Sequence, residues 1–253
     1  FARYAAQKHV ARNGRRDADH DFGTNPCSEI ILRNNQFCNL TEVVIRSTDT
    51  YDDLLVKIRN ATILGTIQST FVNFPYLRKI WQKNTKEERL LGVSLTGIMD
   101  NQLTSNPDPE MLKSLRDYAV EVNKMWSELL DIEPSTAITC IKPSGTVSQL
   151  VDAASGIHAR HNDYYVRTVR GDIKDPLTRL MMDSGIPNEP EVFHPNDTVV
   201  FSFPMKSPSS SVVRKDMTAI QQLELWKTYA LNWTEHKPSV TINVRDSEWL
   251  AVG

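Results

Sequence analysis

The sequence predicts an α/β protein whose strands run mostly parallel. Segments that favour strands alternate with segments that favour helices along the 253 residues, and this order is typical of a parallel sheet covered by helices. The candidate strands lie at residues 29–32, 38–46, 135–141, 165–169, 199–203 and 240–244. The alternation alone does not separate a barrel from a doubly wound sheet.

The expected helices are marked by caps and by apolar spacing. A short helix over the first dozen residues precedes a polar stretch, 13–24, that is too rich in Arg, Asp and Gly to be core. Asp49 or Thr50 can cap the next helix. The clearest helix follows Pro107, where apolar residues recur every three or four positions: Leu112, Leu115, Ala119, Val122, Trp126 and Leu129. The same spacing predicts a helix over 220–233.

The composition argues against several classes of partner. The formal net charge of −2 gives no general attraction to nucleic acid or to an anionic membrane, and no apolar run approaches the roughly 18 residues that span a bilayer. Three cysteines suit the reducing cytoplasm better than a secreted disulfide framework. Because the chain begins with Phe1 rather than Met, we expect a segment of a longer protein, although trimmed ends would look the same.

The most informative window is Asn25-Pro26-Cys27-Ser28-Glu29, with Cys38 eleven residues after Cys27. In an extended segment alternate side chains point to one side, so Asn25, Cys27 and Glu29 could converge on one ligand. An amide, a redox-active thiol and a proton acceptor form a small reaction centre. The alternatives are a buried structural cysteine and a surface carboxylate. The polar neighbours of Cys27 make a poor interior strand and favour the reaction centre.

A second motif follows the candidate strand 135–141. In Lys142-Pro143-Ser144-Gly145-Thr146-Val147-Ser148, a turn that opens into a helix offers backbone N–H groups and hydroxyls, which suit phosphate. The Walker pattern is absent, and by itself the motif is a weak signal that an ordinary strand-to-helix turn explains better.

These two motifs, in this order, resemble the active-site segment and the phosphate loop of ribonucleotide reductases. The Asn-Pro-Cys-Ser-Glu sequence is most similar to the adenosylcobalamin-dependent class. Ser155-Gly156-Ile157-His158 and the glycine-containing stretch 88–97 continue the resemblance.

The resemblance implies a role for each residue. Cys27 would become the thiyl radical that removes the 3′-hydrogen of a ribonucleotide, Glu29 would be the base at the 3′-hydroxyl, and Asn25 would bind the sugar. Cys38 would be one of two thiols that supply electrons and end as a disulfide. The substrate phosphates would bind at Pro143, Ser144, Gly145, Thr146, Val147 and Ser148, and the cofactor would be adenosylcobalamin.

The resemblance also implies a fold and partners. The family has a ten-stranded α/β barrel built from two five-stranded halves, and residues 1–253 would form one segment of it. Within that segment, 1–46 would be the active-site loop and adjoining strand, and 47–253 the second half-barrel. The expected partners are a ribonucleotide, the N-terminal half of the reductase in the same or a separate chain, and a thioredoxin-like reductant in the cytoplasm.

Two alternatives stay open at this stage. A large-subunit fragment of a di-iron reductase is disfavoured because that class spaces the corresponding cysteines farther apart. A non-catalytic nucleotide-binding fragment would have no use for the two thiols Cys27 and Cys38.

Other chemistry-bearing residues have simpler explanations. No Cys-x-x-Cys or comparable ligand pairing predicts a metal site. Cys140 is expected in the core, Tyr164 and Tyr165 on a half-packed strand, and Arg12, Arg15 and Arg16 in a solvated loop.

Overall fold

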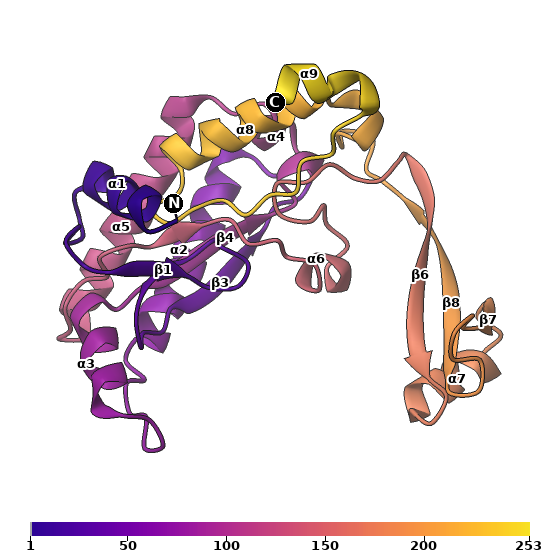
Figure 1. Cartoon of the computed structure of the whole chain (residues 1–253), viewed down its shortest axis with the longest axis horizontal. Helices are drawn as coiled ribbons and strands as arrows, with labels where there is room; N and C mark the ends of the chain where they lie inside the picture. Colours follow the sequence, from indigo (N-terminus) through magenta and orange to yellow (C-terminus); the bar gives the residue numbers. More distant parts are fainter. Residues whose placement is uncertain (1) are drawn as a thin grey trace. The chain divides into compact units, whose positions relative to one another are not determined.

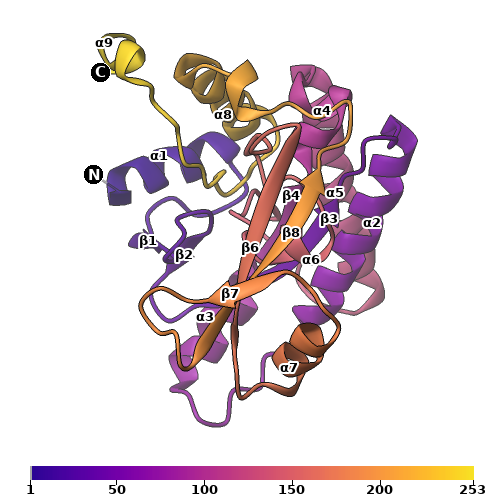
Figure 2. The ribbon, with the colours of Figure 1, turned by 90° about the vertical axis from the view of Figure 1, so that its right-hand side faces the viewer.

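The computed structural model describes residues 2–253, which divide into two compact units. The larger unit comprises the chain up to Arg160 together with Ser210–Gly253, and the smaller unit is His161–Ser209. Figure 1 and Figure 2 show the helices and strands of each unit from two directions.

A parallel sheet lies at the centre of the larger unit. Its strands are β3 (Asn39–Val44), β4 (Leu91–Thr96) and β5 (Thr139–Cys140), in the order β3-β4-β5. Every residue of β4 is buried, as is typical of a parallel strand covered on both faces. Ile141 continues β5 and bridges Pro238 in parallel orientation, so the chain near Pro238 lies along this edge of the sheet.

Three long helices share a core with this sheet. They are α2 (Tyr51–Gln68), α5 (Pro109–Leu129) and α8 (Ala219–Asn232). α2 packs against β3, β4 and α5, and α5 packs against α8. Each helix begins at a side-chain cap, supplied by Thr50, Asp108 and Thr218, which satisfies backbone N–H groups of the first turn. The shared core includes Leu54, Ile58, Leu95, Leu115, Tyr229 and Trp233.

The other elements of the larger unit are short. They are α1 (Ala2–Asn13), β1 (Phe22–Thr24), β2 (Ile31–Arg33), α3 (Lys79–Glu88), α4 (Gln102–Ser105), α6 (Val147–Leu150), α9 (Trp249–Val252) and the 3₁₀ turns Ile98–Asp100, Arg214–Asp216 and Asp246–Glu248. β1 and β2 form an antiparallel hairpin, and α1 lies beside it in both views (Figures 1 and 2). Ala6, Val10, Phe22 and Ile31 form a small apolar cluster of their own.

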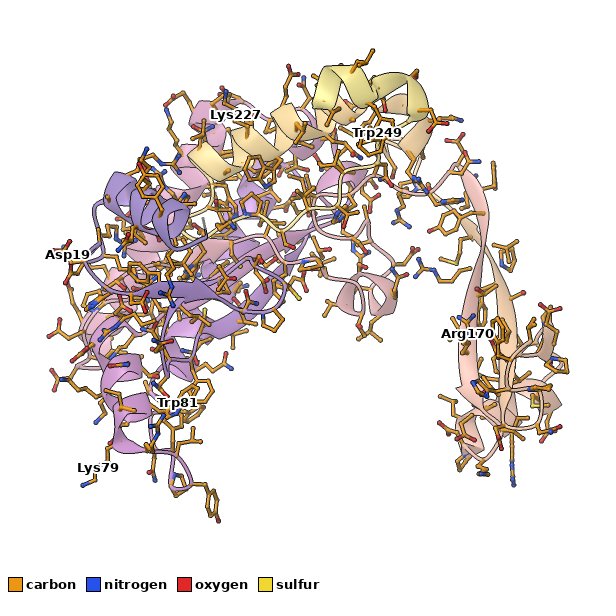
Figure 3. All side chains as sticks on the ribbon, in the orientation of Figure 1. Asp19, Lys79, Trp81, Arg170, Lys227 and Trp249 are labelled. Carbon is orange, nitrogen blue, oxygen red and sulfur yellow. The ribbon has the colours of Figure 1, made fainter. Side chains whose placement is uncertain are left out.

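The smaller unit is an antiparallel sheet with one helix. β6 (Tyr164–Asp172) pairs with β8 (Thr198–Lys206), and β8 pairs with β7 (Asn188–Pro190). α7 (Pro176–Asp183) follows β6 and begins at the cap of Asp175. In Figure 3, Arg170 is labelled on β6; its guanidinium lies 3.6 Å from a carboxylate oxygen of Glu191.

The predicted helices and the strand at 38–46 are confirmed, but three sequence-based expectations are wrong. The strands predicted at 165–169 and 199–203 exist, yet they pair with each other antiparallel rather than joining the parallel sheet. Residues 240–244 form no strand, and the pairing lies earlier, at Pro238. The polar stretch 13–24 contributes to the interior, because Phe22 and Arg16 are buried.

Candidate active site

The hairpin of β1 and β2 carries the cysteine window in its turn. The N–H of Ile30 donates to the Asn25 side-chain oxygen Oδ1 (3.0 Å), and the N–H of Ser28 donates to the backbone carbonyl of Asn25 (2.9 Å). Ser28 has a φ of +65°, a left-handed conformation that reverses the chain. The window is therefore a tight turn and not the extended segment that we expected, so its side chains differ in direction: Cys27 is exposed, whereas Glu29 is fully buried.

Glu29 is held by a lysine from the second motif. Lys142 Nζ donates to Glu29 Oε1 at 2.9 Å, across 113 residues of sequence. The other oxygen, Oε2, is buried and has no hydrogen-bond partner among the described residues. Burial lowers the pKa of Lys142, but the hydrogen bond and the charge of Glu29 outweigh it, and the pKa is raised overall. The structure thus brings together the two motifs that the sequence presents separately.

The backbone around Lys142 is fixed from two sides. The N–H of Lys142 donates to Ser94 Oγ on β4 at 2.9 Å. Gly156, with a φ of +53°, lies so close that a Cβ atom there would be 2.4 Å from the Lys142 carbonyl oxygen. The stretch Ser155–His158 that continued the family resemblance therefore contains a glycine required by this close approach.

The predicted phosphate loop runs from Pro143 to the start of α6. Ser144 has a φ of +54° and a buried hydroxyl without a partner among the described residues. Gly145 and Thr146 are exposed, so the tip of the loop presents backbone N–H groups and a hydroxyl to solvent. Ser148 points inward instead, and its hydroxyl lies 2.6 Å from that of Ser155.

The three thiols occupy different environments. No disulfide joins Cys27, Cys38 or Cys140. Although part of Cys38 is exposed, burial of its thiol raises the pKa, and the charge of Arg16 opposes that effect. Cys140 is fully buried on β5, as expected, and its pKa is raised well above the usual value by burial, by Cys38 and by Glu29.

A buried ion pair between Arg16 and Glu88 connects the hairpin to α3. Arg16 donates to both carboxylate oxygens of Glu88 at the end of α3 and to the carbonyl of Ile31 on β2. Gln36 also donates to Glu88, and Arg15 pairs with Glu235. The expectation of a solvated loop is wrong for Arg15 and Arg16, because these guanidinium groups find partners on segments distant in sequence.

An aromatic cluster fixes the segment that leads to Cys38. The ring of Phe37 packs on Trp81 of α3, with centroids 4.7 Å apart, and on Phe74 at 4.9 Å. Figure 3 labels Trp81 near the lower part of the larger unit. Because Phe37 immediately precedes Cys38, this packing restrains the position of the thiol.

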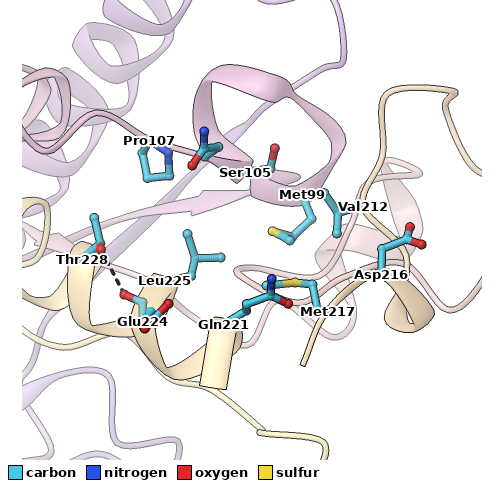
Figure 4. Close-up of a pocket in the computed structure, with 11 residues that line it drawn as sticks. Met99, Ser105, Pro107, Val212, Asp216, Met217, Gln221, Glu224, Leu225 and Thr228 are labelled. Atoms are coloured by element: carbon cyan, nitrogen blue, oxygen red, sulfur yellow. Dashed lines mark hydrogen bonds between the residues drawn. The ribbon is translucent and has the colours of Figure 1, made fainter. Parts of the chain in front are cut away.

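The cavity drawn in Figure 4 does not contain the predicted site residues. It has a volume of about 420 Å³ and lies between the α4 region and α8, where Met99, Pro107, Met217 and Leu225 contribute to its wall. In the described part of the chain, no three His, Cys, Asp or Glu side chains are grouped as ligands for a metal ion. Within residues 2–253, no helix is both long and apolar enough to cross a membrane.

The chain was compared with protein families, curated proteins and solved structures. No family model matches the chain. The chain is 28% identical to the adenosylcobalamin-dependent ribonucleoside-triphosphate reductase of Lactobacillus acidophilus, over 89% of its own length and 34% of that protein. The enzyme of the same name from Euglena gracilis is also 28% identical, over 87% of this chain and 30% of its own.

The fold agrees with this similarity. A crystal structure of a B12-dependent (class II) ribonucleotide reductase superposes on 91% of this chain and 36% of its own, with a TM-score of 0.78 and 24% sequence identity. The chain spans about a third of the length of the curated relatives it matches. The resemblance inferred from the two motifs is confirmed: the chain is similar in sequence to adenosylcobalamin-dependent ribonucleotide reductases and shares its fold with part of the solved class II reductase.

Proposed function

We propose that this chain supplies the catalytic face of an adenosylcobalamin-dependent ribonucleotide reductase and works as part of a longer or split protein. The observation that carries the proposal is the 2.9 Å contact between Lys142 and Glu29. It joins the window that holds the radical cysteine to the loop that would bind the substrate phosphates. The similarity to class II enzymes favours this function over a di-iron reductase fragment.

In the proposed chemistry, the exposed Cys27 and the buried Glu29 have different roles. When bound, adenosylcobalamin would supply the radical, and the exposed Cys27 thiol is accessible to such a group. The Cys27 thiyl would take the 3′-hydrogen atom of the ribonucleotide. The free Oε2 of Glu29 would accept the 3′-hydroxyl proton and stabilise the resulting sugar radical.

Asn25 and Cys38 complete the proposed site. The Asn25 side-chain oxygen holds the turn, which leaves its amide nitrogen to donate to the sugar. Cys38, with a second thiol from outside this chain, would supply two electrons and two protons, so that the 2′-hydroxyl leaves as water, a hydrogen takes its place and the two sulfurs end in a disulfide. A thioredoxin-like dithiol would then reduce that disulfide.

The phosphate loop would bind the other end of the substrate. Gly145 and Thr146 lie at an exposed turn, and the buried hydroxyl of Ser144 has no partner among the described residues; N–H and hydroxyl donors of this kind suit phosphate oxygens. Nucleoside triphosphates are the first substrates to assay, because the similar enzymes carry that substrate in their names.

The test is Cys27→Ser in the full-length protein that contains this chain. Deoxyribonucleotide formation is measured with and without adenosylcobalamin under a dithiol reductant, and nucleotide affinity is measured in parallel. Because Cys27 is exposed, the serine variant should fold and bind nucleotide normally, yet lose at least 10³-fold in turnover, on the order of what essential catalytic groups contribute. Equal activity of the variant would refute the proposal, and binding without turnover in the parent protein would favour the non-catalytic nucleotide-binding alternative.

A further inference from the structure

Lys142 has a role that the motif comparison did not assign to it. Glu29 has no exposed surface, and the Lys142 side chain is 25% exposed, so the pair lies at the boundary between the interior and solvent. A buried carboxylate without a charge partner is driven towards its neutral form. An ammonium group at hydrogen-bond distance stabilises the negative charge that a proton acceptor needs.

The contact also determines which oxygen of Glu29 is available. Oε1 is occupied by Lys142 Nζ, and Oε2 is left without a partner. The backbone of Glu29 is fixed as well, because its carbonyl accepts from the N–H of Lys237 at 2.9 Å. Lys142 therefore fixes the rotation of the carboxylate and leaves Oε2 as the oxygen without a hydrogen-bond partner among the described residues.

The geometry points to Lys142 as the positioning residue of Glu29: it holds Oε1, places an ammonium charge beside the carboxylate, and links it to the phosphate loop that begins at the next residue. This inference rests on the proposed function, in which Glu29 is the base at the 3′-hydroxyl. Lys142 acts through Glu29 and does not itself touch the reacting atoms.

Other charged and titratable groups act on this pair from neighbouring elements. Cys27 lies in the same turn as Glu29, and Cys38 and Glu42 come from the β3 segment. Cys140 comes from β5, and Arg16, from the segment after α1, acts on Cys38. In the variants below these groups stay unchanged, so a shift in pH dependence is attributable to Lys142.

The experiment compares Lys142→Met and Lys142→Arg in the full-length protein. With methionine, kcat at neutral pH should fall about 10²-fold or more, and activity should recover partly at higher pH, because Glu29 then needs a higher pH to ionise. Nucleotide affinity should change less than threefold. Arginine keeps the charge and a donor, and it should restore most of kcat and the parental pH profile.

Lys57→Met is the matched control. Lys57 is also a partly exposed lysine in an ion pair, with Asp49, and it lies on α2 away from the hairpin turn. The Lys57→Met variant should be slightly less stable than the parent, and the dependence of its kcat on pH should be unchanged. If Lys142→Met kept parental kcat and pH profile, or if Lys57→Met gave the same profile as Lys142→Met, the positioning role would be refuted.

A second readout does not depend on turnover. Carbon-13 NMR of labelled glutamate carboxyls follows Glu29 ionisation directly, with Glu29→Gln to assign the signal. The Glu29 signal should titrate at higher pH in Lys142→Met than in the parent, and identical titrations would overturn the inference. The two claims can also fail separately. If the Glu29 signal shifts in Lys142→Met but the Cys27→Ser variant is fully active, the coupling between Lys142 and Glu29 is supported and the proposed reductase function is refuted.

Discussion

At the scale of single residues, the thiols differ as their proposed roles require. Cys27 is exposed, so it can meet a cofactor and a substrate from outside this chain. Burial raises the pKa of Cys38, so this thiol stays protonated at neutral pH and retains the hydrogen that a reductant must deliver. In the proposed mechanism, the exposed Cys27 would form the radical, and the partly exposed Cys38 would serve as a reductant.

Glu42 gives a prediction for stability. It lies on β3 opposite Ser94, and its Oε1 is buried without a partner among the described residues. Burial raises its pKa from 4.5 to about 7, against the opposing charge of Lys142. Between these two pH values the folded chain binds more protons than the unfolded chain, so ionisation of Glu42 lowers the free energy of unfolding as pH rises.

The variant Glu42→Gln tests the predicted direction in which the free energy of unfolding changes with pH. The difference in Tm, variant minus parent, should increase between about pH 4.5 and 7 and stay constant above pH 7. Below pH 4.5 the carboxyl is protonated in both states, so no further change is expected there. Thermal unfolding of the full-length protein at several pH values measures the difference, and a flat or falling difference would contradict the assigned burial of this carboxyl.

The residues that could be predicted from sequence are those whose motif is local. Asn25, Cys27, Glu29 and Cys38 lie within one short window, so spacing, residue type and the family resemblance indicated them together as a candidate site. The pairing of Glu29 with Lys142 spans 113 residues, and no local pattern predicts it. The one available signal was the lysine directly before the phosphate loop, and its partner depends on how the hairpin folds over the sheet.

At the scale of elements, strand β4 supports the hairpin that carries Cys27 through close packing at Gly92. A Cβ atom at Gly92 would lie 2.5 Å from Leu40 Cδ2, 3.1 Å from Ile30 Cδ1 and 3.3 Å from Cys140 Sγ. Ile30 directly follows Glu29, so the contact between Gly92 and Ile30 sets the distance of the hairpin turn from the sheet.

Gly92→Ala should therefore displace the turn. We expect a loss of about 1–3 kcal/mol in the free energy of unfolding, the usual cost of overpacking, and a loss of turnover larger than the loss of nucleotide affinity. Denaturant unfolding and steady-state kinetics measure both effects. Gly23→Ala is the control, because a Cβ at Gly23 on β1 meets no atom within 4 Å; comparable effects of the two variants would contradict this role of Gly92.

The elements that could be predicted were those with local signals. α2 and α5 carry caps and apolar spacing within their own sequence, and their predicted positions were correct. The direction of strand pairing has no such signal: β6 and β8 pair antiparallel across residues 173–197, and alternation of strands with helices wrongly favoured a parallel arrangement. The hairpin turn was missed because Ser28 adopts a left-handed backbone that serine rarely adopts.

At the scale of the whole molecule, the chain presents an incomplete sheet. Among the described strands β3 pairs only with β4, and its other edge is open to further pairing. The chain spans about a third of the length of its curated relatives, and we propose that activity requires a longer or split protein whose further strands would pair with this edge and whose second thiol would pair with Cys38.

The most direct test of the central claim, that Cys27 takes the 3′-hydrogen, is an isotope competition. The full-length protein with adenosylcobalamin is given a mixture of unlabelled and 3′-deuterated ribonucleoside triphosphate, and the residual substrate is analysed by mass spectrometry. The account predicts that deuterium accumulates in the residual substrate, that 4′-deuterated substrate shows no such enrichment, and that Cys27→Ser forms no product. Product formation without discrimination at the 3′ position, or without Cys27, would contradict the account.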